Sequence, residues 1–187
     1  MKKFVFIMLL LALCILSCDG RKTKAESLKE SVAKFKDSLG KLEITEYIPE
    51  KYVEVKTDTL LTNGFAISIK TYTNMKRVVT CKNQVDNTLT HINNYRDWVS
   101  EVTIKKNDKV IFDRVFDANF FLENDKTIAD SLHKAINNKV WIDDEFPLNK
   151  NYVNLVGGFI FPESKKTLYY DIKIDNEGKY SVQKIEN

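Results

Sequence analysis

The densest group of side chains capable of chemistry is the run His91-Ile92-Asn93-Asn94-Tyr95-Arg96-Asp97-Trp98. It combines an imidazole, a phenol, a guanidinium, a carboxylate and an indole. An arginine can hold a carboxylate through two parallel hydrogen bonds, and aromatic rings supply stacking surfaces. The alternative is that the same groups lock a loop to the strand that follows. The candidate ligand-binding residues are therefore His91, Tyr95, Arg96, Asp97 and Trp98.

The other polar groups form no pattern typical of catalysis or metal binding. Asp143-Asp144-Glu145 is acidic, but adjacent carboxylates on an extended segment point in different directions, so a solvated turn is expected. His133 has no histidine or cysteine at metal-ligand spacing, and no nucleophile elbow or metalloprotease helix is present. The sequence predicts no catalytic residue, metal or cofactor. A hydrolase that uses His91 with a distant nucleophile is the alternative.

The beginning of the chain predicts where the protein resides. Lys2 and Lys3 precede an unbroken apolar run over residues 4–16, and Ser17 stands directly before Cys18. This order is typical of a secretory signal, and the run is too short to serve comfortably as a permanent membrane-spanning helix. We expect the segment to be removed during export.

Ile15-Leu16-Ser17-Cys18 resembles the lipobox of bacterial lipoproteins, in which the cysteine is acylated and becomes the mature N-terminus. The resemblance implies a signal peptide over residues 1–17, palmitate-type lipidation of Cys18 and a lipidated tether over residues 18–24. Cys14 is a poorer acceptor because bulky Leu13 precedes it. The alternative is an ordinary signal peptide that leaves Cys18 as a free thiol.

Charge and cysteine content narrow the possible partners. The chain has 29 Lys and Arg against 26 Asp and Glu, and removal of Lys2 and Lys3 with the signal would leave 27 against 26. A nearly neutral chain lacks the basic stripe that nucleic-acid binding requires, so no nucleic-acid partner is expected. With Cys18 acylated, Cys81 has no disulfide partner, and its apolar strand predicts a buried thiol. A reactive or partner-linking thiol is the alternative.

The periodicity of the sequence predicts an N-terminal helix and many strands. Leu28, Val32, Phe35 and Leu39 recur at helical spacing, after two capping-box patterns that begin at Thr23 and Ser27. This stripe suits a core face, and a docking or self-association face is the alternative. From Tyr52 onward the period is two, which is typical of half-buried strands. Hairpin turns are predicted at Asn63-Gly64, 106–108 and 175–178.

A second helix is expected over Lys126–Asn137, capped by Asn124 or Asp125. Gly157-Gly158 interrupts a strongly β segment and predicts a bulge or bend, with a ligand against the backbone as the alternative. Together these features predict an α+β fold with a predominantly antiparallel sheet or sandwich, an N-terminal amphipathic helix and one further helix. Residues 25–187 are expected to form a single β-rich domain that includes the N-terminal helix.

The lipobox, the tether and the stretches Tyr95–Val102 and Lys109–Phe112 resemble small uncharacterised lipoproteins of Bacteroidetes. The resemblance covers most of residues 45–185 and implies a cell-envelope location. Residues 20–24 lack the acidic cluster that resembles a surface-export tag in that group, which favours a position facing the periplasm. We expect the outer membrane, and inner-membrane retention through Asp19 is the alternative. We expect a non-enzymatic binding or scaffolding module, tethered to the membrane, with an envelope protein, peptide or glycan as partner. A periplasmic hydrolase and a self-associating structural lipoprotein are the alternatives.

Overall fold

The computed structural model describes residues 23–38, 40–143 and 149–185. The chain divides into two compact units. The first contains the N-terminal part through Leu42 together with Asp86–Leu89, and the second contains 43–85 and the residues from Thr90 onward. The predicted signal peptide and Cys18 lie outside the described residues, as do Asp144 and Glu145.

The N-terminal unit contains the helix α2 (Lys24–Ser38), which confirms the helix predicted there. A capping box begins it: the Glu26 backbone N–H donates to Thr23 Oγ1 at 3.3 Å, and the Thr23 backbone N–H donates to Glu26 Oε2 at 2.9 Å. Leu28, Val32 and Phe35 share one face and are 67%, 49% and 63% exposed. Within the described part of their own unit, no residue covers this stripe. Leu39 lies outside the described residues.

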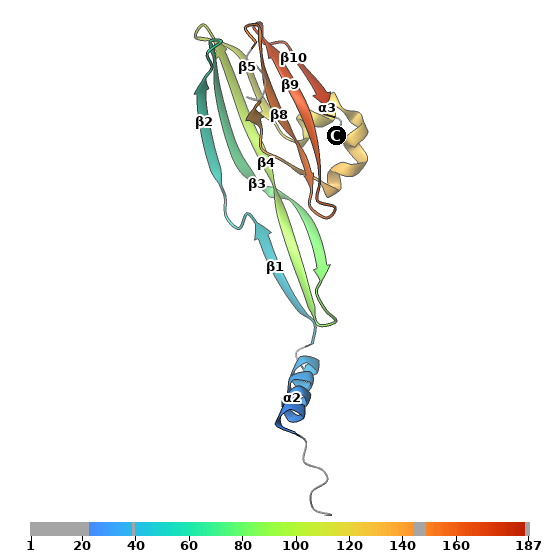
Figure 1. The fold of residues 1–187 in the computed structure, drawn as a ribbon. Coiled ribbons are helices and arrows are strands. Elements are labelled where there is room, and N and C mark those ends of the chain that lie inside the picture. The colour runs from blue at the N-terminus through green and yellow to red at the C-terminus, as the bar shows by residue number, and fades with distance from the viewer. Residues whose placement is uncertain (1–22, 39, 144–148, 186–187) are drawn as a thin grey trace, which may run out of the picture. The chain divides into compact units, whose positions relative to one another are not determined.

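The first sheet is antiparallel where its strands pair along the long β3–β4 hairpin (Figure 1). Its strand order is β1-β4-β3-β2, and β5 also pairs with β4. The register of β3 against β4 shifts between Asn74 and Val78, which marks an irregularity in the hairpin. The strands are β1 (Leu42–Ile48), β2 (Glu54–Leu60), β3 (Phe65–Gln84), β4 (Leu89–Lys106) and β5 (Lys109–Phe116).

The second sheet is also antiparallel and has the order β10-β9-β8-β6, with β7 on the same edge of β8 as β6. β8 and β9 pair without interruption from Tyr152 with Asp175 to Phe161 with Lys166. The strands are β6 (Ile136–Asn137), β7 (Trp141–Ile142), β8 (Tyr152–Phe161), β9 (Lys166–Asp175) and β10 (Tyr180–Lys184).

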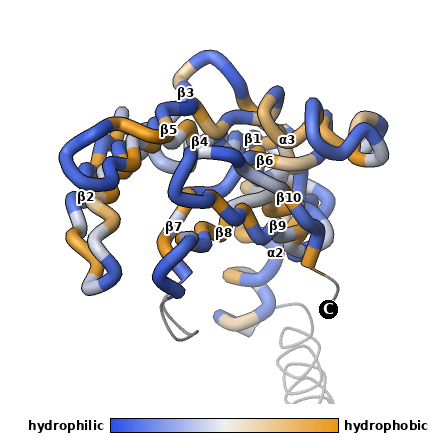
Figure 2. Tube along the Cα trace, turned by 90° about the horizontal axis from the view of Figure 1, so that it is seen from above, coloured by the Kyte–Doolittle hydropathy of each residue, from blue (hydrophilic) through white to orange (hydrophobic). Residues whose placement is uncertain are grey.

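The core lies between the two sheets, whose inner faces bury alternate residues of each strand. In β3 the residues Phe65, Ile67 and Ile69 are at most 5% exposed, and in β9 Ile172 and Ile174 are fully buried. Figure 2 shows the two sheets and the short helices surrounding this shared interior. The predicted α+β class with an antiparallel sandwich is therefore confirmed.

The predicted hairpin turns are confirmed. Each turn joins two strands and contains at least one residue with a positive φ. Gly64 has φ of 85°, and Asn107 and Asp108 have φ of 51° and 59° between β4 and β5. Gly178 has φ of 81° at the β9–β10 turn. A Cβ atom at Gly178 would lie 1.8 Å from the Ile111 carbonyl oxygen, so the turn also needs the absence of a side chain.

The predicted helix over Lys126–Asn137 is only partly correct. The structure has a short helix α3 (Ala118–Asn124) and a 3-10 helix η1 (Lys126–Lys134), with Asp125 between them as the N-cap of η1. Asp125 is one of the two predicted caps. Ile136 and Asn137 belong to β6 instead of a helix, because both pair with β8 and the Asn137 amide donates to the Trp98 carbonyl oxygen at 2.7 Å. Long-range contacts therefore end the helix earlier than the periodicity predicts.

The glycine pair at 157–158 contains no bulge of its own, since both residues pair with β9 in continuous register. The irregularity lies on the opposite edge of β8. Asn137 pairs with Phe159 but Trp141 pairs with Val156, so the segment from β6 to β7 carries one extra residue there. A Cβ atom at Gly157 would lie 3.0 Å from both Phe121 and Val140 side-chain atoms. Close side-chain packing explains this glycine.

Candidate functional site

The candidate cluster from His91 to Trp98 lies on β4, and the strand does not bring its side chains together. Asp97 is 1% exposed, whereas His91, Tyr95 and Arg96 are half-buried. His91 pairs with Asn83 and Tyr95 pairs with Val79, on the side of the register shift that leads to the tip of the hairpin. The prediction of one shared ligand site is therefore not supported by the geometry of the strand.

Asp97 forms a structural ion pair, and its partner is Arg77 instead of the neighbouring Arg96. Arg77 Nη1 lies 2.7 Å from Asp97 Oδ1, and Arg77 Nη2 donates to the carbonyl oxygens of Leu132 and Ala135 at 2.7 and 2.8 Å. The backbone N–H of Asn137 also donates to Asp97. Burial raises the pKa of Asp97, while Arg77 and this backbone N–H oppose the increase. These contacts tie β3 and β4 to the η1–β6 segment.

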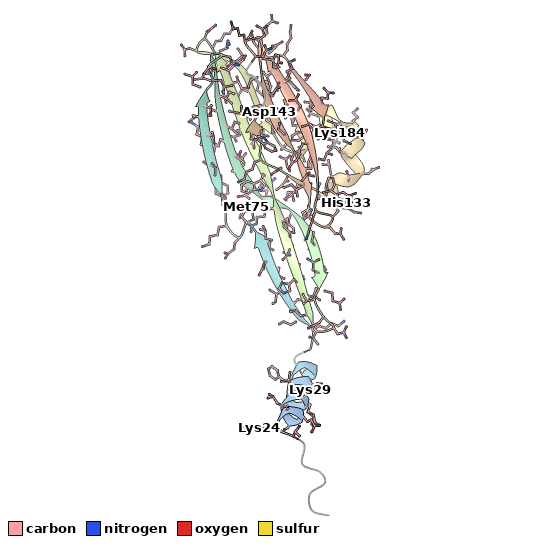
Figure 3. All side chains as sticks on the ribbon, viewed as in Figure 1. Lys24, Lys29, Met75, His133, Asp143 and Lys184 are labelled. Atoms are coloured by element: carbon pink, nitrogen blue, oxygen red, sulfur yellow. The ribbon has the colours of Figure 1, made fainter. Side chains whose placement is uncertain are left out.

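Arg96 lies beside an exposed aromatic and thioether surface. Its Nη1 is 2.6 Å from the Met75 sulfur, and its guanidinium carbon lies 4.8 Å from the centre of the Tyr47 ring. Met75 belongs to the irregular part of β3 and projects away from the second sheet (Figure 3). The Arg96 guanidinium therefore stacks on Tyr47, whereas Asp97 pairs with Arg77.

His133, Cys81 and Asp143 come from separate elements and do not converge. Figure 3 shows His133 on η1 well apart from Asp143, which follows β7. Among the described residues, no three His, Cys, Asp or Glu side chains could hold a metal ion together. Cys81 is a buried free thiol, as predicted, and burial raises its pKa. A raised pKa lowers the thiolate fraction and with it the reactivity of this cysteine.

Trp98 contacts a residue that lines a concave surface. Lys139 places its Nζ 4.3 Å from the centre of the Trp98 ring, a cation–π contact. Lys139 itself lines a groove of about 480 Å³ between the two sheets, where β2 and β7 face each other. Figure 2 shows these two strands on the same side of the sandwich. We call this hollow the β2–β7 groove; it is lined by Val55, Thr57, Ile69, Thr71, Asn138, Lys139, Val140, Trp141 and Ile142.

The strand registers explain how the groove is built. Val55 pairs with Thr71 and Thr57 with Ile69, and residues directly opposite in a sheet share a face. Thr71 and Ile69 are each 5% exposed on the core face, so Val55 and Thr57 point toward the second sheet as well. β2 has seven residues but β7 has two, and Val55 remains 50% exposed. The second sheet therefore fails to cover the inner face of β2.

A small hydrogen-bond network holds the opposite wall in place. The Val140 backbone N–H donates to Ser100 Oγ at 3.2 Å, and the Ser100 and Thr71 hydroxyl groups lie 2.8 Å apart. These groups are buried, so the network is protected from water. It fixes the segment that carries Lys139 and Val140 against β3 and β4.

Sequence reasoning missed most of the groove. Trp98 was among the candidates, but Val55, Lys139 and Trp141 were not. The available signal was the presence of both tryptophans of the chain, Trp98 and Trp141, in β-rich segments beside apolar residues. Trp141 is 40% exposed and contacts the Tyr169 ring edge to face at 5.4 Å. Trp141 is therefore partly exposed in the groove that it lines.

No protein-family model matches the chain, and no curated protein matches it. In the part of the chain that the structure describes, no helix has the length and apolar character needed to cross a membrane.

Proposed function

We propose that the protein is a cell-envelope lipoprotein, anchored through acylated Cys18, whose β-sandwich is a non-enzymatic binding module facing the periplasm from the outer membrane. The β2–β7 groove is the observation that carries the proposal of binding. Its volume of about 480 Å³ falls within the range of about 300–1,000 Å³ that small-molecule sites occupy. The anchor follows from the lipobox resemblance of residues 15–18.

The chemistry of the lining supports binding in preference to catalysis. Val55, Ile69, Val140 and Ile142 supply apolar side chains, and threonine and asparagine side chains supply a few polar groups. Binding sites commonly combine an apolar lining with a small number of polar groups that orient the ligand. The described lining contains no histidine, cysteine or carboxylate that could act as a base or nucleophile.

The proposal is tested by mapping where an apolar probe attaches. The full chain, in membranes isolated from expressing cells, is irradiated with an uncharged alkyl diazirine, and the attachment sites are found by peptide mass spectrometry. We expect labelling to concentrate on β2 and on residues 138–142. Val55→Phe fills the groove from β2 and is expected to reduce this labelling severalfold.

Val110→Phe is the matched control. Val110 is 48% exposed on the edge strand β5, against 50% for Val55 on the edge strand β2, and it does not line the groove. We expect Val110→Phe to leave groove labelling unchanged. Labelling that is spread evenly over the described surface, or that Val55→Phe does not reduce, would contradict a binding function for the groove.

A further inference from the structure

We propose that the β2–β7 groove binds the alkyl chain of a single-chain anionic amphiphile, of the fatty-acid class, and that Lys139 binds its negatively charged head group. This inference rests on the proposed function, because it names the ligand class of the same groove.

The walls suit a chain of methylene groups. Ile69 and Val140 form part of the buried core at 5% exposure each, and Ile142 packs against that core from β7. An alkyl chain lying along these side chains exchanges water for apolar contact, which is worth about 0.8 kcal/mol per methylene. Because Thr71 already hydrogen bonds to Ser100, this wall offers little to a strongly polar ligand.

The charge in the groove is positive and is held at one position. Among the described residues that line the groove, Lys139 alone is charged. Its ammonium lies 4.3 Å from the centre of the Trp98 ring and has no carboxylate partner in the described part of the chain. A cation over an aromatic face keeps the capacity to pair with an anion, because the ring supplies no formal negative charge. Trp98 is therefore a positioning residue for Lys139.

An extended peptide fits the same groove less well. A peptide brings a backbone N–H and C=O at nearly every residue, and each must find a partner when it is buried. The free backbone edge of β2 lies in the plane of its sheet, whereas the groove lies across the inner face of that sheet, over Val55 and Thr57. A peptide lying there would place its backbone against aliphatic side chains. An alkyl chain has no such groups to satisfy.

The test is competition against the uncharged diazirine label with the full chain in membranes. Fatty acids of increasing length and the alcohols of equal length are compared at equal free concentration. We expect each added methylene to strengthen competition about fourfold until the groove is filled, the equivalent of about 0.8 kcal/mol. The carboxylate is expected to compete about fivefold better than the alcohol, the equivalent of about 1 kcal/mol for an exposed ion pair.

Three variants identify the head-group contact. Lys139→Gln is expected to remove the advantage of the carboxylate over the alcohol, whereas Lys139→Arg keeps it. Trp98→Leu is expected to reduce that advantage, because it removes the ring that positions Lys139. Lys166→Gln, an exposed lysine on β9 outside the groove lining, is the matched control and is expected to change nothing.

The possible failures are distinguishable. If the diazirine labels the groove and Val55→Phe prevents it, but the acid and alcohol compete equally, the inference is wrong and the proposed function stands. If the carboxylate keeps its advantage over the alcohol in Lys139→Gln, the proposed head-group contact is wrong. Competition by apolar peptides without competition by fatty acids would overturn the amphiphile and indicate a peptide ligand. An unlabelled groove would overturn both proposals.

Discussion

Asp97 shows how one buried charge can determine the behaviour of a whole segment. Asp97 is 1% exposed. Its carboxylate forms an ion pair with Arg77 and accepts a hydrogen bond from the Asn137 backbone N–H. A buried carboxylate without a partner is costly, because the protein interior solvates charge poorly. Arg77 therefore mainly offsets the free-energy cost of burying the Asp97 carboxylate, and adds little net stability beyond that.

We predict that Arg77→Met destabilises the fold by about 3 kcal/mol at neutral pH, the lower end for breaking a buried pair, because the Arg77 side chain is 29% exposed. Burial already raises the pKa of Asp97 above its unfolded value, and loss of Arg77 raises it further. A raised carboxyl pKa means that stability falls as the pH rises from the unfolded pKa toward the folded one. The destabilisation should therefore shrink as the pH is lowered from 7 toward 4.

Urea unfolding of the full chain at several pH values measures this effect. Lys56→Met is the matched control, because the Lys56–Asp58 pair is 59% and 63% exposed and should contribute less than about 1 kcal/mol. A loss for Arg77→Met that is independent of pH would show that the lost bonds to the Leu132 and Ala135 carbonyls dominate instead.

At the scale of elements, Asp125 connects η1 to the second sheet. Its Oδ1 accepts from the Thr127 backbone N–H at 2.9 Å, and its Oδ2 accepts from the Tyr170 hydroxyl at 2.9 Å. The Thr127 hydroxyl contributes most to holding the Asp125 pKa below its usual value, and the Tyr170 hydroxyl adds to this. Burial raises the pKa of Tyr170, and the hydrogen bond to Asp125 raises it further. One carboxylate thus both caps a helix and satisfies a core tyrosine.

We predict that Asp125→Ala lowers the free energy of unfolding by about 1–2 kcal/mol at pH 7, since it removes the cap and leaves the buried Tyr170 hydroxyl without its acceptor. Asp125→Asn keeps an acceptor oxygen and should cost less. A depressed carboxyl pKa contributes stability above the unfolded pKa and loses it as the pH falls through the folded pKa. The difference between Asp125→Ala and the unmodified chain should therefore narrow below about pH 4 in chemical unfolding. An equal loss in both variants would contradict the capping role.

The extent to which the sequence predicts these elements depends on how local their causes are. The turns at Gly64 and at Asn107-Asp108 follow from backbone preferences of those residues, and the start of α2 follows from Thr23 and Glu26. The end of the second helix does not, because Asn137 is bound by the Trp98 and Phe116 carbonyl oxygens, 39 and 21 residues away in the chain. Periodicity carries no information about such contacts.

The candidate site follows the same rule. A compact run of polar side chains on β4 suggests a site, but alternation along a strand sends neighbouring residues to opposite faces, so Arg96 and Asp97 acquire different partners. The β2–β7 groove combines Val55 with Lys139 and Trp141, which are distant in sequence. Their proximity requires both the β2–β3 register and the bulged segment before β7.

At the scale of the sandwich, aromatic side chains pack together on one side, and the β2–β7 groove lies on the other. On the aromatic side, Phe116 and Phe120 lie 4.2 Å apart between ring centres, and Phe112 meets Tyr180 at 5.7 Å. On the groove side, β2 faces the much shorter β7 across the groove. Aromatic rings therefore fill the side where no ligand is proposed, and the uncovered inner face of β2 lines the groove that we propose as the binding surface.

The last prediction concerns the lipid anchor proposed at Cys18, because this anchor would place the proposed binding surface at a membrane. We expect the unmodified chain and Cys14→Ala to incorporate an alkyne-bearing palmitate in growing bacteria and to sediment with membranes, whereas Cys18→Ala incorporates none. Acyl chains contribute about 0.8 kcal/mol per buried methylene, so more than one chain holds a protein stably at a bilayer. Label retained by Cys18→Ala, or lost in Cys14→Ala, would contradict the assignment. Anionic amphiphiles concentrate at membrane surfaces, so the anchor proposed at Cys18 would hold the proposed amphiphile groove where such ligands are most abundant.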